Sequence, residues 1–362
     1  MKSPERILVR APNWIGDQIL AYPFFHFLRQ AYPRAQITSV CVQWVQDLQF
    51  RNLIDRVVVL PRAVDESLWE RWKVQESGAE QLRGQGRYDL AIALPNSLSS
   101  AWLLYRAGAR VRRGYSLEGR RLLLNEPVVW NETSSRHRAQ AYVDLLPARA
   151  RPSREVRWFF GIPAENELDP RIPGVVPGFP AREAWPGFAP LTPPDEPYWV
   201  LAPGATADSR RWPTSYFAAL ARRVRSETGW TGLVVGGPKE APMAHELCGD
   251  PSLGLRDWTA RGPVPTLSEV FARAKFTLTN ESGLAHVAAV CGSFVQIVCG
   301  AADPKRTTPL GPGRAQVAIN PVECWPCERN TCAQPAVTKI QCLTGIRPET
   351  VWEEIQRGIR LG

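Results

Sequence analysis

The sequence predicts an α/β protein made of two successive units of alternating strands and helices. Apolar strands alternate with helical spacing on both sides of residues 162–197, and this segment holds ten of the chain's 33 prolines. Proline removes a backbone donor and disrupts helices and inner strands, so we interpret 162–197 as an interdomain segment. The length of 362 residues also suits two domains. We therefore assign one domain to 1–161, a second to 198–347, and a C-terminal helix to 348–362.

The predicted elements place five turns where a ligand is expected. In the first half, strands are predicted at 5–9, 36–42, 56–60 and 88–95, and helices at 18–32 and 66–83. In the second half, strands are predicted at 198–204, 231–237, 275–280 and 294–300, and helices at 213–228, 266–274, 283–291 and 348–360. Such alternation indicates parallel sheets, whose ligands bind beyond the carboxyl ends of the strands. The turns of interest are 10–17, 94–100, 203–213, 236–241 and 280–286.

Composition narrows the class of protein. Hydrophobic residues make up 44% of the chain and charged residues 22%, which is ordinary for a globular protein and excludes disorder or a coiled coil. No apolar run approaches the ~18 residues of a membrane span, and the N-terminus has no signal-peptide core. We expect a cytoplasmic protein. The net charge of +9 favours an anionic partner, such as a phosphorylated substrate, an acidic lipid surface or nucleic acid, although it also fits a solvated basic surface.

The turn 10–17 ends with a carboxylate at the start of a helix. Its sequence runs Arg-Ala-Pro-Asn-Trp-Ile-Gly-Asp, with Asn13 in the turn and Asp17 at the helix start. Free backbone amides at a helix N-terminus stabilise an ionised carboxylate. Asp17 therefore has two interpretations, a helix-capping acid or a general base.

Two turns of the second half have the chemistry of an anion site. Residues 203–213 combine Gly204 and the hydroxyl of Thr206 with Arg210 and Arg211, a combination that suits a pyrophosphate. The turn at 279–286 offers the hydroxyls, glycine amide and helix start of a second diphosphate contact, through Glu281, Ser282, Gly283 and His286. After another glycine turn, Glu240 is placed to bind a ribose. The alternative interpretations are that the two turns are ordinary polar loops, that His286 is a structural histidine and that Glu240 is a surface acid.

Several common nucleotide motifs are absent from the sequence. It has no strand-linked G-x-G-x-x-G, no Walker A motif and no D-x-D carboxylate pair. We therefore expect arginines and helix N-termini, and no catalytic metal, to neutralise a diphosphate leaving group.

Four of the eight cysteines lie within one short segment. They are Cys324, Cys327, Cys332 and Cys342. Four thiols that open with C-x-x-C are able to hold a tetrahedral structural zinc or iron, although the spacing is not that of a zinc finger or ribbon. Unligated thiols and a redox role are the alternatives.

Four stretches resemble glycosyltransferase family 9, the ADP-heptose:lipopolysaccharide heptosyltransferases. They are APNWIGD (11–17), YDLAIALPNSLSSA (88–101), PGATADSRRWP (203–213) and TNESGLAHVAA (279–289). They occur in the order typical of the family and span most of the chain. The resemblance implies a GT-B architecture, in which two Rossmann-like domains face each other across a cleft. It also implies inverting transfer of heptose from ADP-heptose to the inner core of lipopolysaccharide.

The resemblance gives these residues expected roles. Asp17 matches the catalytic base, Arg210 or Arg211 the basic residue facing the diphosphate, and Glu240 lies near the ribose contact. The second donor turn is matched by Ser282, Gly283 and His286. Asn13, Asn96 and Ser97 are expected beside the acceptor. The family usually has Asp where this chain has Glu281, and Lys-Arg where it has two arginines.

The acceptor implied by the resemblance is a lipid A–inner core molecule, which is anionic. Arginines crowd one stretch of the first domain: Arg106, Arg110, Arg112, Arg113, Arg120 and Arg121. We expect Arg120 and Arg121 to contact the acceptor, and the protein to meet the inner face of the cytoplasmic membrane peripherally. A solvated basic face is the alternative for this stretch.

Two other functions remain open from the sequence. The cysteine cluster and Glu281 also fit a related enzyme that heptosylates protein or uses another nucleotide sugar. The charge, the 14 tryptophans and the cysteines fit a metal-stapled nucleic-acid-binding protein. The basic residues do not interleave with aromatic residues in a recognisable module, so we expect no nucleic-acid partner.

Overall fold

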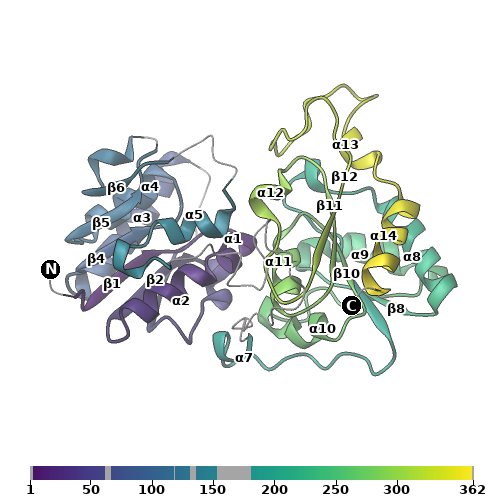
Figure 1. The fold of residues 1–362 in the computed structure, drawn as a ribbon, viewed down its shortest axis with the longest axis horizontal. Helices are drawn as coiled ribbons and strands as arrows, with labels where there is room; N and C mark the ends of the chain where they lie inside the picture. Colours follow the sequence, from purple (N-terminus) through teal and green to yellow (C-terminus); the bar gives the residue numbers. More distant parts are fainter. Residues whose placement is uncertain (1–2, 62–66, 118, 131–135, 153–180, 361–362) are drawn as a thin grey trace. The chain divides into compact units, whose positions relative to one another are not determined.

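The computed structural model describes residues 3–61, 67–117, 119–130, 136–152 and 181–360, which form two compact units (Figure 1). The first unit contains the described residues up to 152 together with Arg182–Gly187, and the second contains residues 188–360. Each unit has its own six-stranded sheet, and all of the strand pairings are parallel. The predicted class of two parallel α/β units is confirmed. Of the proline-rich segment, residues 162–180 lie outside the described part.

The sheet of the first unit has the strand order β3-β2-β1-β4-β5-β6. Its strands are β1 (Arg6–Arg10), β2 (Gln36–Val42), β3 (Arg56–Leu60), β4 (Leu90–Ala93), β5 (Val111–Tyr115) and β6 (Glu126–Val128). The central strand β1 is buried after its first residue, and Val9 pairs with Ser39 on one side and Ile92 on the other. A continuous apolar strand of this kind is typical of a sheet covered on both faces.

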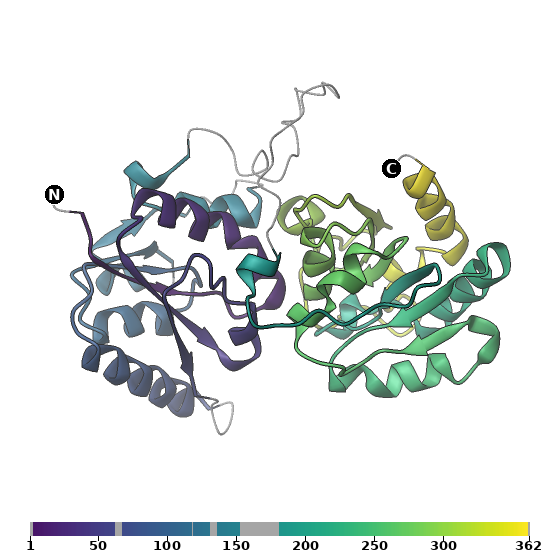
Figure 2. The same ribbon diagram turned by 90° about the horizontal axis from the view of Figure 1, so that it is seen from below.

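Helices cover both faces of this sheet (Figures 1 and 2). They are α1 (Ile15–Leu20), α2 (Tyr22–Ala31), α3 (Leu68–Gly84), α4 (Leu98–Arg106) and α5 (Arg138–Asp144), with 3-10 turns η1 (Gln43–Leu48), η2 (Arg120–Leu122) and η3 (Ala148–Ala150). Helices α3 and α4 pack together on one face, where Leu82, Leu103 and Leu104 join the apolar core. Helices α1, α2 and α5 pack against one another on the other face. A short helix, α7 (Ala181–Ala184), contacts this unit through a hydrogen bond from the Arg51 amide to the Ala184 carbonyl.

The second unit repeats the plan with the strand order β12-β11-β10-β7-β8-β9. Its strands are β7 (Tyr198–Ala202), β8 (Thr231–Val234), β9 (Leu255–Asp257), β10 (Thr277–Asn280), β11 (Val295–Cys299) and β12 (Ala315–Ile319). Its helices are α8 (Thr214–Thr228), α9 (Ala241–Cys248), α10 (Ser268–Ala272), α11 (Gly283–Val290), α12 (Pro304–Thr307), α13 (Gln341–Thr344) and α14 (Pro348–Arg360). The 3-10 turns are η4 (Asp208–Arg210), η5 (Pro238–Glu240), η6 (Pro251–Leu253) and η7 (Val264–Leu267).

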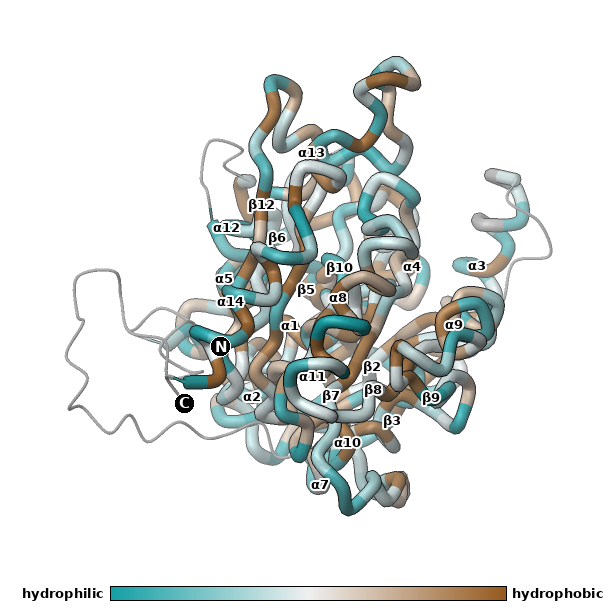
Figure 3. Tube along the Cα trace, turned by 90° about the vertical axis from the view of Figure 1, so that its right-hand side faces the viewer, coloured by the Kyte–Doolittle hydropathy of each residue, from teal (hydrophilic) through white to brown (hydrophobic). Residues whose placement is uncertain are grey.

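Large aromatic side chains fill the core between the second sheet and helices α8 and α14. Trp199 on β7 stacks on Phe276 at a ring distance of 5.1 Å, and Trp352 of α14 lies 6.1 Å from the same Phe276 ring. Figure 3 shows hydrophobic residues along the strands, as a buried sheet requires. Helix α14 packs closely against the Phe294 ring because Gly358 has no side chain. A Cβ at Gly358 would lie 2.1 Å from that ring.

Both sheets have the same topology, which decides where ligands bind. Numbered within its own unit, each sheet reads 3-2-1-4-5-6 from one edge to the other. The connections run to opposite sides of the two central strands, so a crevice forms beyond the carboxyl ends of those strands. In the first unit the central strands are β1 and β4, and in the second they are β7 and β10. Four of the five turns singled out in the sequence follow these four strands.

The structure differs from the predicted elements in several respects. Helices α4, α5 and α9 are among the elements that were not predicted. The single helix expected at 18–32 is two helices, α1 and α2, because Pro23 near the start of α2 provides no amide to continue the first helix. Strands β5, β6, β9 and β12 were not predicted; β5 and β9 carry arginines, and β6 and β9 have three residues each. Every described helix is too short or too polar to cross a bilayer.

We predict that Phe276→Ala lowers the free energy of unfolding by about 3–5 kcal/mol, because it empties space beneath both Trp199 and Trp352. Chemical denaturation followed by tryptophan fluorescence measures this loss. The control is Trp69→Ala, since Trp69 is 69% exposed and its truncation should change stability by less than ~0.5 kcal/mol. Equal losses for the two variants would contradict this description of the core.

Candidate functional site

A buried arginine organises the turn after β1. Arg10 is 3% exposed, and its Nη1 donates to the carbonyls of Ala11 (2.5 Å) and Val40 (3.3 Å). Its Nη2 donates to Asn13 Oδ1 at 2.6 Å, and the Trp44 indole donates to the Asn13 carbonyl at 2.6 Å. Burial lowers the pKa of Arg10 to about 10, so the group remains a cation at neutral pH. Asn13 is thus fixed from both its side chain and its backbone.

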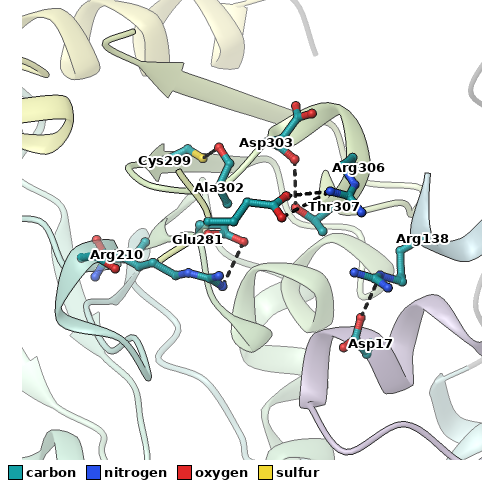
Figure 4. A network of polar contacts seen from close by, with 12 residues as sticks. Asp17, Arg138, Arg210, Glu281, Cys299, Ala302, Asp303, Arg306 and Thr307 are labelled. Atoms are coloured by element: carbon teal, nitrogen blue, oxygen red, sulfur yellow. Dashed lines mark hydrogen bonds and ion pairs between the residues drawn. The ribbon is translucent and has the colours of Figure 1, made fainter. Parts of the chain in front are cut away.

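Asp17 lies in the first turn of α1, beside Arg138 of α5. The N-cap of α1 is Trp14, so Asp17 is not the capping residue. Arg138 Nε lies 3.8 Å from Asp17 Oδ1 (Figure 4). Burial, followed by the negative charge of Asp17, raises the pKa of the nearby Tyr142 on the same helix as Arg138. The Asp17 side chain is 27% exposed, so solutes can reach it. A partly exposed carboxylate at the start of a helix is suited to act as a general base.

The turn after β4 contains Asn96 and Ser97. Ser97 is the N-cap of α4, and its hydroxyl accepts from the Ser100 amide at 3.3 Å. Arg120 has no exposed surface, and its Nη1 donates to the Pro95 carbonyl (3.0 Å) and Asn96 Oδ1 (3.4 Å). Arg120 therefore holds the turn from beneath, whereas the neighbouring Arg121 is exposed.

Asn280, at the end of β10, ties the two central turns of the second unit together. It is fully buried; its Oδ1 accepts from the Trp212 amide at 2.9 Å and its Nδ2 donates to the Pro203 carbonyl at 2.5 Å. Arg210 Nη1 donates to Oε1 of the next residue, Glu281, at 3.4 Å (Figure 4). The turns 203–213 and 279–286, predicted separately from the sequence, thus meet at one place.

The rest of the turn after β7 has mixed exposure. Arg211 Nη1 lies 3.0 Å from Asp208 Oδ1, and its Nη2 donates to the Ala205 carbonyl at 2.9 Å. Thr206 is exposed. Both arginines are partly exposed and are held by contacts that an incoming anion could replace.

Glu240 and Gly204 also lie together. A Cβ at Gly204 would sit 2.7 Å from Glu240 Cγ, so the close approach of the two turns requires glycine. Glu240 Oε2 accepts from the Gly237 amide at 2.8 Å, which orients the carboxylate. The structure therefore brings the turn after β8 against the turn after β7, as a nucleotide site at this edge would need.

Helix α11 starts with backbone amides that its own N-cap does not satisfy. The N-cap is Ser282, which makes no capping hydrogen bond, and its hydroxyl lies 3.1 Å from Thr279 Oγ1. Gly283 is the first helical residue, and His286 lies one turn later and is buried. Uncapped amides at a helix N-terminus attract anions. Arg210 contacts Glu281, the residue that precedes the N-cap Ser282, and so adds a positive charge near these amides.

The four clustered cysteines line one small cavity. The cavity has a volume of about 150 Å³, and Ser209 also lines it. All four are free thiols, and the backbone amide of Ile340 donates to Cys332 Sγ at 3.4 Å. Burial, followed by the neighbouring thiols, raises the pKa of Cys342. Within the described ranges, no three Cys, His, Asp or Glu side chains are arranged to hold a metal ion, so the geometry does not support a structural metal.

The cysteine segment is attached to the turn after β7 at Ser209. The Ser209 hydroxyl donates to the Arg329 carbonyl at 2.5 Å, and its amide donates to the Asn330 carbonyl at 3.5 Å. Sequence reasoning missed this contact and the roles of Arg10 and Asn280. Ser209 and Asn280 act through partners far along the chain, for which the local sequence carries no signal. Arg10 binds its neighbours Ala11 and Asn13 as well as the distant Val40, and its burial beneath the turn could not be deduced from the sequence.

Comparison with known proteins gives consistent matches. The model of glycosyltransferase family 9 (heptosyltransferase) matches residues 77–338. Lipooligosaccharide heptosyltransferase 2 of Haemophilus ducreyi is 27% identical over 319 residues, which cover 84% of this chain and 86% of that protein.

Solved structures agree with this match. Escherichia coli ADP-heptose lipopolysaccharide heptosyltransferase II superposes with a TM-score of 0.71 at 22% identity, covering 98% of this chain and 99% of the other. Escherichia coli heptosyltransferase WaaC with ADP-2-deoxy-2-fluoro heptose gives a TM-score of 0.67 at 18% identity, covering 97% and 99%. These likenesses establish the shared two-unit fold.

We predict that the buried thiols resist alkylation at pH 8. Burial raises the pKa values of Cys41, Cys291 and Cys299 to about 12, and the negative charge of Glu281 adds to the effect at Cys299. Only the thiolate reacts, and a pKa of about 12 leaves a thiolate fraction of ~10⁻⁴ at pH 8. Mass spectrometry after iodoacetamide treatment should find the exposed Cys324 labelled first. Labelling of Cys299 as fast as Cys324 would contradict the assigned burial.

Proposed function

We propose, from the premise that the chain belongs to glycosyltransferase family 9, that it moves heptose from ADP-heptose to the inner core of lipopolysaccharide with inversion. The observation that carries this proposal is the pairing of Arg210 and Glu281 beside the uncapped start of α11, at the switch point of the second sheet. The relatives named heptosyltransferase 2, and the structure of WaaC with an ADP-heptose analogue, support the choice of donor and acceptor.

The second unit is assigned to the donor. Arg210 and Arg211 would bind the diphosphate oxygens, together with the amides of Ser282 and Gly283 and the hydroxyl of Thr206. Gly204 lets the chain approach the nucleotide, Glu240 would accept from the ribose hydroxyls, and His286 lies beneath the diphosphate turn. Glu281 holds Arg210 in place at 3.4 Å. Arginine binds phosphate oxygens in a bidentate manner but cannot donate a proton, so its contribution is electrostatic.

The first unit is assigned to the acceptor and the base. Asn13, Asn96 and Ser97 would bind acceptor hydroxyls, and Arg121 an acidic group. Arg120 is buried, so its contribution would be to hold Asn96 in position. Asn13 follows β1, and Asn96 and Ser97 follow β4, the two central strands of their sheet, whereas Arg120 and Arg121 follow β5.

The reaction needs one proton acceptor and stabilisation of one leaving group. Asp17 takes the proton from the acceptor hydroxyl while that oxygen bonds to the anomeric carbon of the heptose. The bond from this carbon to the diphosphate oxygen breaks, and ADP leaves with the electron pair on its β-phosphate. Arg210, Arg211 and the α11 amides stabilise the negative charge that develops there.

No catalytic metal is assigned in this mechanism. The guanidinium groups and helix amides take the place that a divalent cation occupies in enzymes with paired carboxylates. We also propose a cytoplasmic location with peripheral contact at the inner membrane face, where a lipid-linked acceptor is found. The exposed arginines of the first unit, including Arg110 and Arg121, are suited to an acidic surface.

We predict that Asp17→Asn slows transfer by about 10²–10⁴-fold, because general-base catalysis typically contributes that much. Affinity for ADP should stay nearly unchanged, since Asp17 belongs to the first unit and the donor contacts are assigned to the second. Turnover of ADP-heptose with a lipid-linked core acceptor measures the first quantity and calorimetry the second. A variant with full activity would remove Asp17 from the mechanism.

We predict that Arg210→Ala combined with Arg211→Ala weakens ADP binding and slows turnover together. Loss of charge-assisted hydrogen bonds to a diphosphate should raise Kd for ADP by at least tenfold. Arg222→Ala is the matched control, because Arg222 pairs with Asp250 on the surface of the same unit. An ADP affinity equal to that of the control variant would place the donor elsewhere. Transfer to protein but not to lipid-linked core would favour the protein-modifying alternative.

A further inference from the structure

Two buried residues bracket the arginine pair in the donor turn, residues 203–213. Ser209 precedes Arg210 and is 3% exposed, and Trp212 follows Arg211 and has no exposed surface. The side chains of Arg210 and Arg211 are 29% and 38% exposed. The backbone on either side of the pair is therefore held inside the second unit, while the guanidinium groups reach solvent.

Trp212 is held from two directions. Its amide donates to Asn280 Oδ1 at 2.9 Å, and its indole donates to the Ile346 carbonyl at 3.0 Å. Both partners are buried, one at the end of β10 and the other just after α13. The end of the donor turn that follows Arg211 is thus fixed to the rest of the unit.

Ser209 is bound by the cysteine segment, residues 324–342. Its hydroxyl donates to the Arg329 carbonyl at 2.5 Å, and its amide donates to the Asn330 carbonyl at 3.5 Å. A buried hydroxyl that loses its acceptor is costly, so these contacts restrain Ser209. Ser209 is the middle residue of η4, whose last residue is Arg210, so a shift of Ser209 also displaces Arg210.

The cysteine segment is itself attached to the second sheet and to α12. The amide of Glu328, the residue before Arg329, donates to the Ala301 carbonyl at 2.8 Å, just after β11. The carboxylate of Glu328 accepts from Arg306 Nη1 on α12, at 3.0 Å to one oxygen and 3.3 Å to the other. The segment can therefore serve as a support for the donor turn.

A glycine at the end of β11 allows the donor turn to lie against this strand. A Cβ at Gly300 would lie 2.7 Å from the Ser209 carbonyl oxygen and 2.8 Å from the Leu343 side chain. Contacts this short do not occur in folded proteins, so a larger residue at Gly300 would push Ser209 away. The position of Ser209 thus depends on β11 as well as on the cysteine segment.

We infer that Ser209 is a positioning residue for Arg210: the cysteine segment holds the Ser209 hydroxyl, and Ser209 keeps Arg210 in the place assigned to the donor diphosphate. The inference rests on the proposed donor role of Arg210 and Arg211. It goes beyond that role because it gives the cysteine segment a function, support of the donor turn. A misplacement of about 1 Å at a functional group can cost ~10²-fold in rate, so this support matters.

The first test compares two buried serines of the second unit. Ser209→Ala removes the hydroxyl that the cysteine segment holds. Ser293→Ala is the matched control: Ser293 is 1% exposed, and its hydroxyl lies 2.8 Å from Thr277 Oγ1. Ser293 precedes β11, so it lies at the end of the sheet opposite to the donor turns.

We expect Ser209→Ala to raise Kd for ADP about fivefold, the effect of losing one buried hydrogen bond. It should lower kcat/KM for ADP-heptose by a larger factor, because the arginines act on charge that develops in the transition state. KM for the acceptor should stay unchanged. Ser293→Ala should keep all three quantities at the parent values.

A conservative variant tests the hydroxyl itself. Ser209→Thr keeps the donor, and the cavity of about 150 Å³ that Ser209 lines has space for the added methyl group. We expect Ser209→Thr to restore most of the ADP affinity that Ser209→Ala loses. Equal losses in the two variants would overturn the role of the hydroxyl.

The second test moves Ser209 without changing it. Gly300→Ala should displace the Ser209 backbone and raise Kd for ADP at least fivefold. Gly84→Ala is the control, because a Cβ there has no atom within 4 Å. Parent ADP affinity in a folded Gly300→Ala variant would overturn the inference. Circular dichroism checks the fold of each variant, and Ser209→Ala decides the question if Gly300→Ala does not fold.

The outcomes separate this inference from the proposed function. If the double variant of Arg210 and Arg211 binds ADP as tightly as Arg222→Ala, the donor assignment is wrong and the inference falls with it. If the double variant loses ADP affinity while Ser209→Ala behaves like Ser293→Ala, only the role of Ser209 is overturned.

Discussion

The strand order of the two sheets is the constraint on which the rest of the structure depends. Each sheet reads 3-2-1-4-5-6 within its unit. The first three strands are therefore added toward one edge of the sheet and the last three toward the other, starting from the two central strands. The crevice beyond these strands is the place where backbone amides and helix starts are left for a ligand. Asp17 and Asn96 in one unit, and Arg210 and Ser282 in the other, owe their positions to this topology.

Charged and polar groups buried beneath the turns hold their shape. Arg10 binds the turn after β1 from below, and Arg120 does the same after β4. Asn280 joins the two central turns of the second unit. A buried polar group that loses its hydrogen bonds is costly, so each of these side chains restricts the backbone that it contacts. The partly exposed groups, such as Asp17 and Arg210, are then presented on a rigid base.

The sequence was sufficient for the fold class and for the turns, because both depend on local signals. Hydrophobic period and glycine position predicted the central strands, and the four family motifs fall on the turns that follow them. The family model confirms the resemblance to family 9, and the curated relatives named heptosyltransferase 2 agree with it. Partners distant in sequence could not be predicted: Arg138 lies 121 positions from Asp17, and packing of α5 on α1 brings them together. The edge strand β5, Val111–Tyr115, was missed because two adjacent arginines hide its apolar pattern.

The most direct measurement is calorimetric titration of the full chain with ADP and with ADP-heptose in the presence of EDTA. We predict saturable binding of both ligands without divalent metal, because guanidinium groups and helix amides are assigned to the diphosphate. Absence of binding for both ligands would contradict the assignment of the second unit to the donor. Binding that appears only after a divalent cation is added would contradict the metal-independent mechanism.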